Sequence, residues 1–293
     1  MIDRPVLRLR LSPAESFAAQ GPLAHRVEKF ANGWARATGL SELPGCHIQI
    51  ETIPSEHSGL GVGTQLGLSV AAGLNELTEQ PMANAERLAA QTGRGVRSAV
   101  GVYGFLHGGL IVDDGKLPDE KLSPLLHRCA IPDDWRVVLI RPAQGQGLSG
   151  TEERQAFEGA PAVDPRVSKS LRNEVAERML PALAEGNFEG FSASVYRFGK
   201  TAGECFSAVQ QGPYHGPLLT GIVETARNLG VTGVGQSSWG PTIYCLLPDA
   251  VSAAGFADKM KSSMTSADLE CVIAQPCNLG AIVKKLKTVV PAR

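Results

Sequence analysis

The sequence predicts an α+β fold arranged as two domains, on the basis of three observations. Strand-like and helical segments are mixed along the 293 residues without a regular strand–helix–strand rhythm, which disfavours a doubly wound parallel sheet. Hydrophobic residues make up 43% of the chain and charged residues 19%, a globular composition that can form one large core or two smaller ones. A Gly-rich change in composition at residues 142–150 places the domain boundary between residues 1–146 and 147–293.

The first half contains strands, helices and two Gly-rich segments. Alternating or short apolar runs predict strands at residues 6–11, 46–53, 110–112 and 137–140. Apolar residues at helical spacing predict helices at residues 22–38, 66–77 and from the N-cap Asn84 onward. The Gly-rich segments are a loop at residues 54–63 and a longer stretch at residues 93–109.

The second half follows the same rules. Helices are predicted at residues 169–185, 187–200, 218–229 and 251–260. Strands are predicted at residues 242–247, 270–274 and 281–289. A Gly- and Ser-rich loop at residues 230–240 runs directly into the first of these strands.

Charge and cysteine content exclude several classes of protein. The formal net charge is -1, so a general nucleic-acid binder is not expected. No apolar run is long enough to span a membrane, and residues 1–11 lack the pattern of a secretory signal. The six cysteines include no CxxC pair, which disfavours a zinc site or a disulfide framework. We therefore expect a cytoplasmic protein whose partners are small molecules, with no nucleic acid and no membrane.

The segment EHSGLGVGTQ at residues 56–65 combines a glycine-rich turn with the start of a helix. Closely spaced glycines turn backbone N–H groups inward and a helix N-terminus adds partial positive charge, so the segment predicts a phosphate cradle rather than a simple turn. It is not a dinucleotide fingerprint, because Thr64 stands where the third glycine of GxGxxG belongs. It is not a Walker A loop, since the only GKT, at residues 199–201, lacks the preceding glycine.

The triplet Gly59-Leu60-Gly61 resembles the phosphate loop of the GHMP kinase superfamily, whose pattern is roughly PxxxGLGSSAA. The resemblance implies a ribosomal protein S5 domain 2-like N-terminal domain and a ferredoxin-like C-terminal domain. Two kinase groups are exchanged. Val62 and Gly63 stand at the serine positions, one of which helps to hold Mg²⁺, and Gly101 stands where an Asp accepts the substrate proton. Thr64 is the remaining candidate ligand for Mg²⁺, and phosphate binding is favoured over phosphoryl transfer.

The exchanged segments resemble one branch of the superfamily, the beta-ribofuranosylaminobenzene 5′-phosphate synthases. They are GLGVGTQ at 59–65, GRGVRSAVG at 93–101, HGGLIVDDG at 107–115, GLSGTEERQAF at 147–157 and GVGQSSWGPTIY at 233–244. The resemblance implies that phosphoribosyl diphosphate and 4-aminobenzoate, or 4-hydroxybenzoate, yield a C-riboside, CO₂ and diphosphate in tetrahydromethanopterin biosynthesis. It also implies Mg²⁺ carried mostly by substrate and water.

The resemblance and the local chemistry nominate the site residues. For phosphate binding we expect Gly59, Gly61, Gly63, Thr64 and Gln65, with the N–H groups of Gly61, Gly63 and Thr64 at the diphosphate. For catalysis we expect Arg97 and His57. For substrate binding we expect Arg94, Ser98, Gln236, Ser237, Ser238, Trp239 and Gly240. The segment 233–240 is expected to close over the phosphate loop from the second domain.

Four of these residues have two interpretations. Arg94 and Arg97 either bind the 5-phosphate or the benzoate carboxylate, or form a solvated pair beside a helix start. His57 either donates to diphosphate or caps its turn. Trp239 either stacks on the aromatic substrate or packs under its own loop.

Three acidic residues near these motifs are expected to be structural. Asp113 and Asp114 suit a hairpin turn better than a metal site. Glu152 is expected to cap a helix over residues 152–157.

Relatives in the branch carry residues before the segment that matches Ile2-Asp3-Arg4-Pro5, so the N-terminal domain is expected to lack its first strands and to expose an edge at residues 6–11. Two other functions remain open. One is an ATP-dependent small-molecule kinase of the same fold that uses Thr64 for Mg²⁺. The other is a non-catalytic nucleotide- or phosphate-binding module. A homodimer is also considered.

Overall fold

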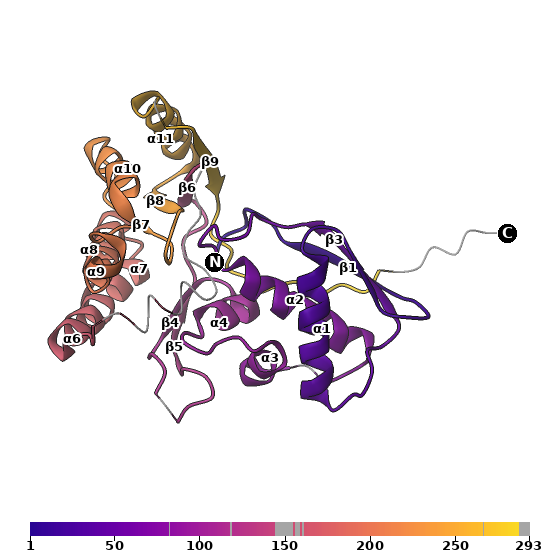
Figure 1. The fold of residues 1–293 in the computed structure, drawn as a ribbon. Helices are drawn as coiled ribbons and strands as arrows, with labels where there is room; N and C mark the ends of the chain where they lie inside the picture. The colour runs from indigo at the N-terminus through magenta and orange to yellow at the C-terminus, as the bar shows by residue number, and fades with distance from the viewer. Residues whose placement is uncertain are drawn as a thin grey trace.

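The computed structural model describes residues 1–81, 83–117, 119–143, 155, 159, 161–265 and 267–286. It has two halves, each with its own sheet and helices, as Figure 1 shows. The predicted α+β class is confirmed.

The first half is built on a three-stranded sheet of order β1-β3-β2. Its strands are β1 (Arg8–Pro13), β2 (Ala18–Gln20) and β3 (Cys46–Thr52), with β1 antiparallel and β2 parallel to β3. Strand β1 lies at the sheet edge. The helices are α1 (Ala24–Thr38), α2 (Val62–Leu77), α3 (Ala85–Thr92) and α4 (Val100–His107). A hairpin of β4 (Leu110–Asp113) and β5 (Leu125–Cys129) completes this half.

A buried polar network locks three of these helices together. Helix α1 turns Trp34 into the core, where the side chain is fully buried. The indole N–H of Trp34 donates to Asn75 Oδ1 of α2 at 2.8 Å, and Asn75 exchanges hydrogen bonds with Gln91 of α3 at 2.9 and 3.0 Å. Because each buried polar group finds a partner, the network fixes the helix positions without a desolvation penalty.

The second half is built on an antiparallel sheet of order β7-β8-β6-β9. Its strands are β6 (Arg136–Pro142), β7 (Val234–Gln236), β8 (Ile243–Leu247) and β9 (Leu269–Ala274). The helical elements are α6 (Pro165–Glu174), the π-helix η1 (Val175–Met179), α7 (Leu180–Ala184), α8 (Phe188–Glu204), α9 (Ser207–Gln210), α10 (Gly216–Asn228) and α11 (Ala250–Ser263). Residues of α10 and α11 share one hydrophobic core with β6 and β8.

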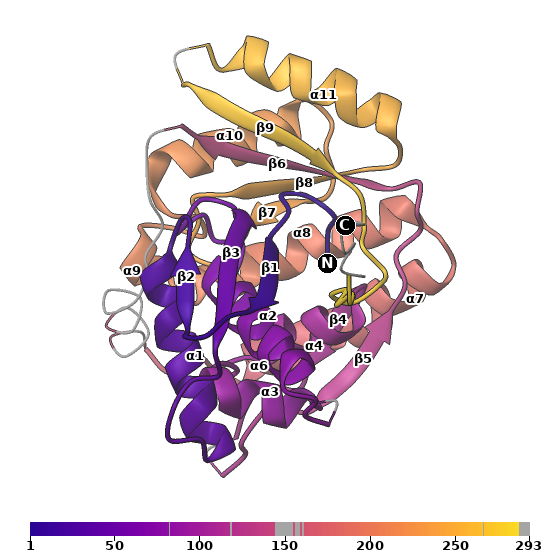
Figure 2. The ribbon, with the colours of Figure 1, turned by 90° about the vertical axis from the view of Figure 1, so that its right-hand side faces the viewer.

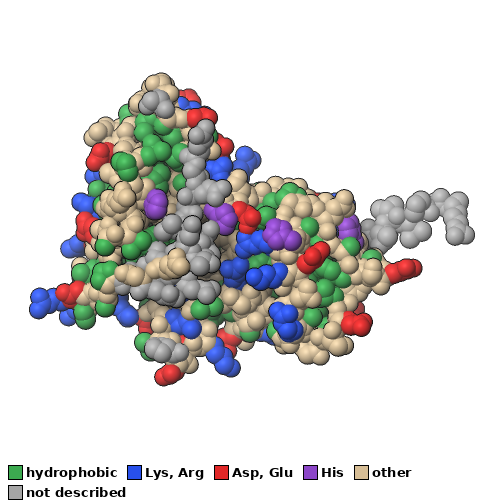
Figure 3. All heavy atoms as spheres, in the orientation of Figure 1, with side chains coloured by type: hydrophobic (Ala, Val, Ile, Leu, Met, Phe, Trp, Pro, Cys, Tyr) green, Lys and Arg blue, Asp and Glu red, His purple; other side chains and the backbone are tan. Residues whose placement is uncertain are grey.

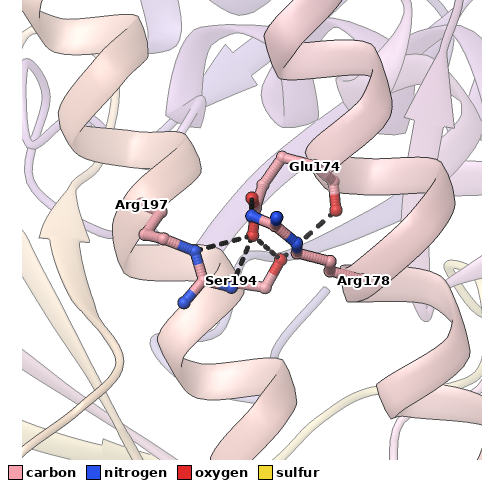
Figure 4. Close-up of polar contacts among 4 residues, drawn as sticks. All are labelled: Glu174, Arg178, Ser194 and Arg197. Carbon is pink, nitrogen blue, oxygen red and sulfur yellow. Dashed lines mark hydrogen bonds and ion pairs between the residues drawn. The ribbon is translucent and has the colours of Figure 1, made fainter.

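Glu174 joins α6 to α8 at the start of the π-helix. Its Oε1 accepts from Ser194 Oγ at 2.6 Å and from the Arg197 guanidinium at 2.7 and 3.0 Å, while Oε2 accepts from Arg178 at 2.9 Å (Figure 4). Burial alone raises the pKa of Glu174. The hydrogen bonds from Arg197, Ser194 and Arg178 outweigh that effect and lower the pKa below its ordinary value.

The two ends of the chain help to join the halves. Figure 2 shows the C-terminal segment after β9 running from the second half into the first, beside the N-terminus. Ile2 forms an isolated bridge with Pro276, and the Gly109 N–H donates to Cys277 O at 2.7 Å. On the surface, Arg172 of α6 pairs with Asp114 at 2.6 Å.

Most predicted elements are present, and six differences stand out. The structure adds β2, β5 and α9, and it forms α4 and β7 inside the two Gly-rich segments 93–109 and 230–240. Residues 281–286 form no strand, and the remainder of the strand predicted at 281–289 lies outside the described residues.

The predicted domain boundary at 146/147 lies outside the described residues. Strand β6, which the prediction placed in the first domain, belongs to the second sheet because it pairs with β8 and β9. No helix in the described ranges is both long and apolar enough to cross a membrane.

Candidate functional site

The glycine loop leads from β3 directly into the N-terminus of α2. Gly61 is the N-cap of α2 and adopts a left-handed conformation with φ 69°, which glycine tolerates without strain. A Cβ at Gly61 would meet nothing within 4 Å, so its backbone faces open space. Gly63 lies in the first turn of a 16-residue helix whose backbone dipole is positive at this end. This geometry supports the predicted anion cradle.

Helix α2 begins at Val62, earlier than the sequence indicates, so one of the backbone N–H groups expected to face the phosphate is part of the helix. The Thr64 N–H donates to Gly61 O at 2.9 Å, so helix formation already uses it. This N–H is therefore already engaged within the helix, and its contact with diphosphate stays a prediction. Gly61 and Gly63 remain the predicted backbone donors of the cradle.

A segment from the second half closes on this loop. The Ser237 hydroxyl donates to Gly59 O at 2.8 Å, and the Thr242 hydroxyl donates to Ser58 O at 2.6 Å. A Cβ on Gly59 would lie 2.4 Å from Ser237 O and 2.7 Å from Gly240 O, so only glycine allows the two backbones to approach this closely. The expected closure of 233–240 over the phosphate loop is thus present, and Gly59, Ser237 and Gly240 form the junction.

Two guanidinium groups lie over the start of α2. A Cβ on Gly63 would be 2.6 Å from a terminal nitrogen of Arg26 and 3.4 Å from one of Arg94. Both guanidinium carbons lie over the Phe30 ring, at 5.9 Å for Arg26 and 5.0 Å for Arg94. Figure 3 shows Lys and Arg side chains gathered where the first half faces the second. The cradle is therefore lined by two cations as well as by N–H groups.

Arg26 was missed by the sequence analysis, which treated residues 22–38 only as an amphipathic helix. It forms an ion pair with Glu56 at the start of the glycine loop, with both side chains about three quarters buried. The sequence did contain an indication: Arg26 precedes Val27 and lies four residues before Phe30, and both of these apolar residues belong to the buried face of α1. Nothing in the sequence alone indicated that this face meets the loop.

Gly101, at the position of the kinase Asp, packs directly against the loop. A Cβ on Gly101 would lie 3.1 Å from the methyl carbon of Thr64, and the Gln65 side chain donates to Gly101 O at 3.1 Å. Gln65 therefore connects α2 to α4, and its contact with phosphate stays a prediction. Thr64 occupies the space into which an acidic side chain at position 101 would extend.

Two residues that were predicted to contact substrate also have structural roles. Gln236 uses its amide to hold the loop: Oε1 accepts from His215 N–H at 2.6 Å, and Nε2 donates to Ser238 O at 2.9 Å and to Gln210 Oε1 at 3.3 Å. Trp239 is only 5% exposed and packs edge-on to Phe206 at 5.2 Å between ring centroids, so packing under the loop is the interpretation that the structure supports.

Asp113 has the predicted turn role, because its Oδ1 accepts from the Gly115 N–H at 3.3 Å in the turn after β4. Its Oδ2 accepts from Ser98 Oγ at 2.8 Å, from the Ala99 N–H at 2.7 Å and from Ser123 Oγ at 2.9 Å. It therefore anchors the start of α4, and it engages the hydroxyl of Ser98 that was predicted to bind substrate. Asp114 pairs with Arg172.

The remaining predicted residues lie around the cradle. His57 has a left-handed backbone with φ 58° and is half-buried in the loop, while Arg97 is exposed just before α4. Ser238 is exposed, also with a left-handed backbone, φ 54°. Glu152 lies outside the described residues.

No cluster of three or more His, Cys, Asp and Glu side chains within the described ranges is arranged to hold a metal ion by itself. Mg²⁺ is commonly bound through substrate phosphates and water with one or two protein ligands. A cradle that offers backbone N–H groups, two arginines and the Thr64 hydroxyl fits that mode of binding.

Two family descriptions match the chain. Residues 25–109 match the GHMP kinases N terminal domain and residues 179–266 match the GHMP kinases C terminal domain, which together cover more than half of the chain. The first range contains the glycine loop, and the second contains the segment that closes on it.

Two curated relatives have the same name. The beta-ribofuranosylphenol 5′-phosphate synthase of Methanothermobacter thermautotrophicus is 30% identical over 210 residues, covering 68% of this chain and 62% of that protein. The enzyme of the same name from Archaeoglobus fulgidus is 27% identical and covers 97% of this chain and 90% of its own length. The chain thus aligns with less than two thirds of the first relative and with most of the second.

Solved structures share the fold at low identity. Homoserine kinase from Cytophaga hutchinsonii superposes with a TM-score of 0.66 at 15% identity, covering 95% of this chain and 89% of that chain. Mevalonate kinase from L. major in complex with R-mevalonate superposes with a TM-score of 0.64 at 17% identity, covering 92% and 86%. The fold of this chain therefore follows the arrangement seen in these kinases.

Proposed function

Since the chain belongs to the GHMP kinase family, we propose that it uses the family's phosphate site for ribosyl transfer rather than for phosphoryl transfer. The substrates are phosphoribosyl diphosphate and a 4-substituted benzoate, and the products are an aryl C-riboside 5′-phosphate, CO₂ and diphosphate. The relatives named beta-ribofuranosylphenol 5′-phosphate synthase support this reaction and favour the hydroxylated ring. The resemblance of the motifs supports a role for the product in tetrahydromethanopterin biosynthesis.

The packing at Gly101 carries the proposal. The anion cradle of the family is retained at Gly61 and Gly63, but the position of the kinase base has no side chain, and a Cβ placed there would lie 3.1 Å from the Thr64 methyl group. A glycine cannot accept a proton from an attacking hydroxyl. Loss of the base is tolerable only for a reaction in which the nucleophile needs no deprotonation, and an electron-rich aromatic ring is such a nucleophile.

The proposed step balances without a redox partner. The bond from ribose C1 to the diphosphate oxygen breaks, and the ring carbon that bears the carboxylate forms a bond to C1. The carboxylate then leaves as CO₂, and its bonding electron pair restores the aromatic ring. The protein's task is to stabilise charge on the departing diphosphate and to align the ring with C1.

The described residues suit that task. The N–H groups at the start of α2 and the guanidinium groups of Arg26 and Arg94 surround the position where the leaving group's charge develops. Bound Mg²⁺ would neutralise part of the same charge, with the Thr64 hydroxyl as its protein ligand and phosphate oxygens and water as the others. Arg97 and His57, at the rim, are proposed to contact the 5-phosphate or the benzoate carboxylate and the diphosphate.

To test the proposal, the protein is incubated with phosphoribosyl diphosphate, Mg²⁺ and either 4-hydroxybenzoate or 4-aminobenzoate. The carboxyl group of the benzoate is labelled with ¹⁴C. The expected result is release of labelled CO₂ in equal amount to diphosphate. ATP consumption with an alcohol or sugar acceptor, without CO₂ release, would establish the kinase alternative that uses Thr64. Binding of phosphoribosyl diphosphate without turnover of either kind would establish a non-catalytic module.

Variants of the ion pair test the cradle itself. Replacing Arg26 by Ala is expected to weaken phosphoribosyl diphosphate binding by about 10- to 100-fold, because a charge-assisted contact is lost and Glu56 is left without its partner. Arg36→Ala is the matched control, since Arg36 lies on the same helix in its last turn, away from the loop. Equal affinities of the two variants would remove Arg26 from the site.

A further inference from the structure

A second recess lies in the C-terminal half, between α8, α9 and the β7–β8 loop. Its volume is about 250 Å³. Its walls are mainly aromatic and small residues with two glutamines: Phe198, Gly199, Ala202, Gly203, Phe206, Gln210, Pro213, Gln236, Ser238, Trp239 and Tyr244. We refer to this space as the aromatic cavity. None of the reaction steps described above uses it.

The size and walls of the aromatic cavity suit one substituted benzene ring. An apolar cavity of about 150 Å³ is enough to bind benzene, so 250 Å³ leaves room for ring substituents. Phe206 and Trp239 already meet edge-on at 5.2 Å, a geometry that a third ring can extend. A nucleoside phosphate would instead require cationic side chains, and no Lys or Arg is among the described residues that line the cavity.

The two glutamines in the wall are occupied by the protein. The Gln210 amide donates to Gly203 O at 3.0 Å and to Pro213 O at 2.9 Å, and Gln236 is held by His215, Ser238 and Gln210. They therefore shape the aromatic cavity rather than recognise a ligand.

Tyr244 differs from the glutamines. Among the described residues its hydroxyl makes no hydrogen bond, although it lies against the backbone of Gly199 and Gly235. Burial raises the pKa of Tyr244 to about 12, so the hydroxyl stays protonated at neutral pH and can donate to a ligand or accept from one. The hydroxyl is accessible to solvent, so a ligand that enters the cavity can replace water as its hydrogen-bond partner.

The aromatic cavity and the phosphate loop lie on either side of one short segment. Ser237 O and Gly240 O of this segment approach Gly59, while Ser238 and Trp239 between them line the aromatic cavity. A ligand in the cavity is therefore one segment away from a diphosphate held at the start of α2.

We propose that the aromatic cavity holds the ring of the 4-substituted benzoate, with its 4-hydroxyl or 4-amino group at Tyr244. This proposal rests on the proposed function and names the acceptor subsite for it. The carbon that attacks ribose C1 bears the carboxylate and lies opposite the 4-substituent. The neutral end of the ring thus enters the apolar space, and the charged, reacting end stays at the mouth, where desolvation of the carboxylate is avoided.

The test uses calorimetric titration of the full chain with 4-hydroxybenzoate and with 4-aminobenzoate, in the absence of phosphoribosyl diphosphate. Tyr244→Phe is expected to weaken binding about 3- to 10-fold, and Ala202→Leu, which fills the space, to abolish it. Tyr196→Phe is the matched control for Tyr244→Phe. Tyr196 lies on α8, as Ala202 does, but it lies outside the cavity and its ring packs against the Arg227 guanidinium at 4.4 Å. Thermal melting verifies that each variant is folded.

Fluorescence provides a measurement that does not depend on the fold of Ala202→Leu. Either benzoate is expected to quench wild-type tryptophan emission, and the quenching is expected to disappear in Trp239→Phe while Trp34 and Trp135 remain. Wild-type affinity in folded Tyr244→Phe together with quenching that persists in Trp239→Phe would overturn the proposal.

The outcome also separates this proposal from the proposed function. Benzoate binding that depends on Tyr244, without release of CO₂, would uphold the aromatic cavity and reject ribosyl transfer. If Tyr244→Phe and Ala202→Leu turn over substrate with an unchanged KM for benzoate, ribosyl transfer is upheld and the aromatic cavity is rejected as the benzoate subsite.

Discussion

Gly59 and Gly61 have similar backbone conformations but different surroundings, so the same substitution at the two positions can be compared. Both residues have left-handed φ values, 76° and 69°, and both lie in the same loop. A Cβ at Gly61 meets nothing within 4 Å, whereas one at Gly59 meets two backbone carbonyl oxygens at 2.4 and 2.7 Å. Alanine at the two positions therefore separates the conformational cost from the cost of parting the two loops.

The expected magnitudes follow from these contacts. An alanine forced into the left-handed region costs about 1–2 kcal/mol, and the reduced entropy of the unfolded chain returns up to about 1 kcal/mol. Gly61→Ala should therefore lower the free energy of unfolding by about 1 kcal/mol. Gly59→Ala must in addition displace Ser237 and Gly240 and break the bonds to Gly59 O and Ser58 O, worth about 1 kcal/mol each. Its total cost should be about 3 kcal/mol.

Equilibrium unfolding in urea measures both variants against the wild-type chain. The quantity of interest is the difference between them, about 2 kcal/mol, because the strain term is common to both. Destabilisation of Gly59→Ala and Gly61→Ala by the same amount would refute the inference that Gly59 exists to let the loops meet.

Three further predictions concern packing inside the two halves of the chain. Asn75→Ala should lower the free energy of unfolding by about 2–4 kcal/mol, since the Trp34 N–H and the Gln91 amide lose their buried partner. The control is Asn32→Ala on the exposed face of α1, which should change the free energy of unfolding by less than about 0.5 kcal/mol; equal changes in urea unfolding would contradict this. Glu174→Gln should destabilise by about 1–3 kcal/mol at neutral pH. The folded pKa of Glu174 lies below its ordinary value of 4.5, so this stabilisation is present above pH 4.5 and is lost as the pH falls through the folded pKa. The difference in the free energy of unfolding between Glu174→Gln and wild type should therefore shrink in acid. Glu177→Gln is the control, and a difference that does not change with pH would show that the charge of Glu174 is not responsible. Gly101→Ala should stabilise the wild-type chain by less than the roughly 1 kcal/mol expected in a helix, because the new methyl group presses on Thr64. The full stabilisation should appear only when Thr64 is also replaced by Ser. Additive effects of the two substitutions on the free energy of unfolding would show that the two positions are not coupled.

Local periodicity was sufficient for most of the elements. The helix at 22–38 and the strand at 46–53 are visible in the sequence because one face of each is apolar and buried, and that face recurs at the period of the element. The short elements β2, β5 and α9 were missed because three to five residues carry too little periodic signal. Helix α4 was missed because the surrounding glycines resemble a loop.

The candidate site divides in the same way. The sequence by itself determined that a glycine-rich turn begins a helix at residues 59–65 and that the kinase Asp is a glycine, because both depend on residue identity within a short stretch. Only the tertiary structure decided that Arg26 lies over that turn, that Gly59 meets Ser237 and Gly240, and that Gln65 bonds to α4. Each of these contacts joins positions far apart in the chain, and their distances are set by how helices and loops pack, which no local pattern of residues encodes.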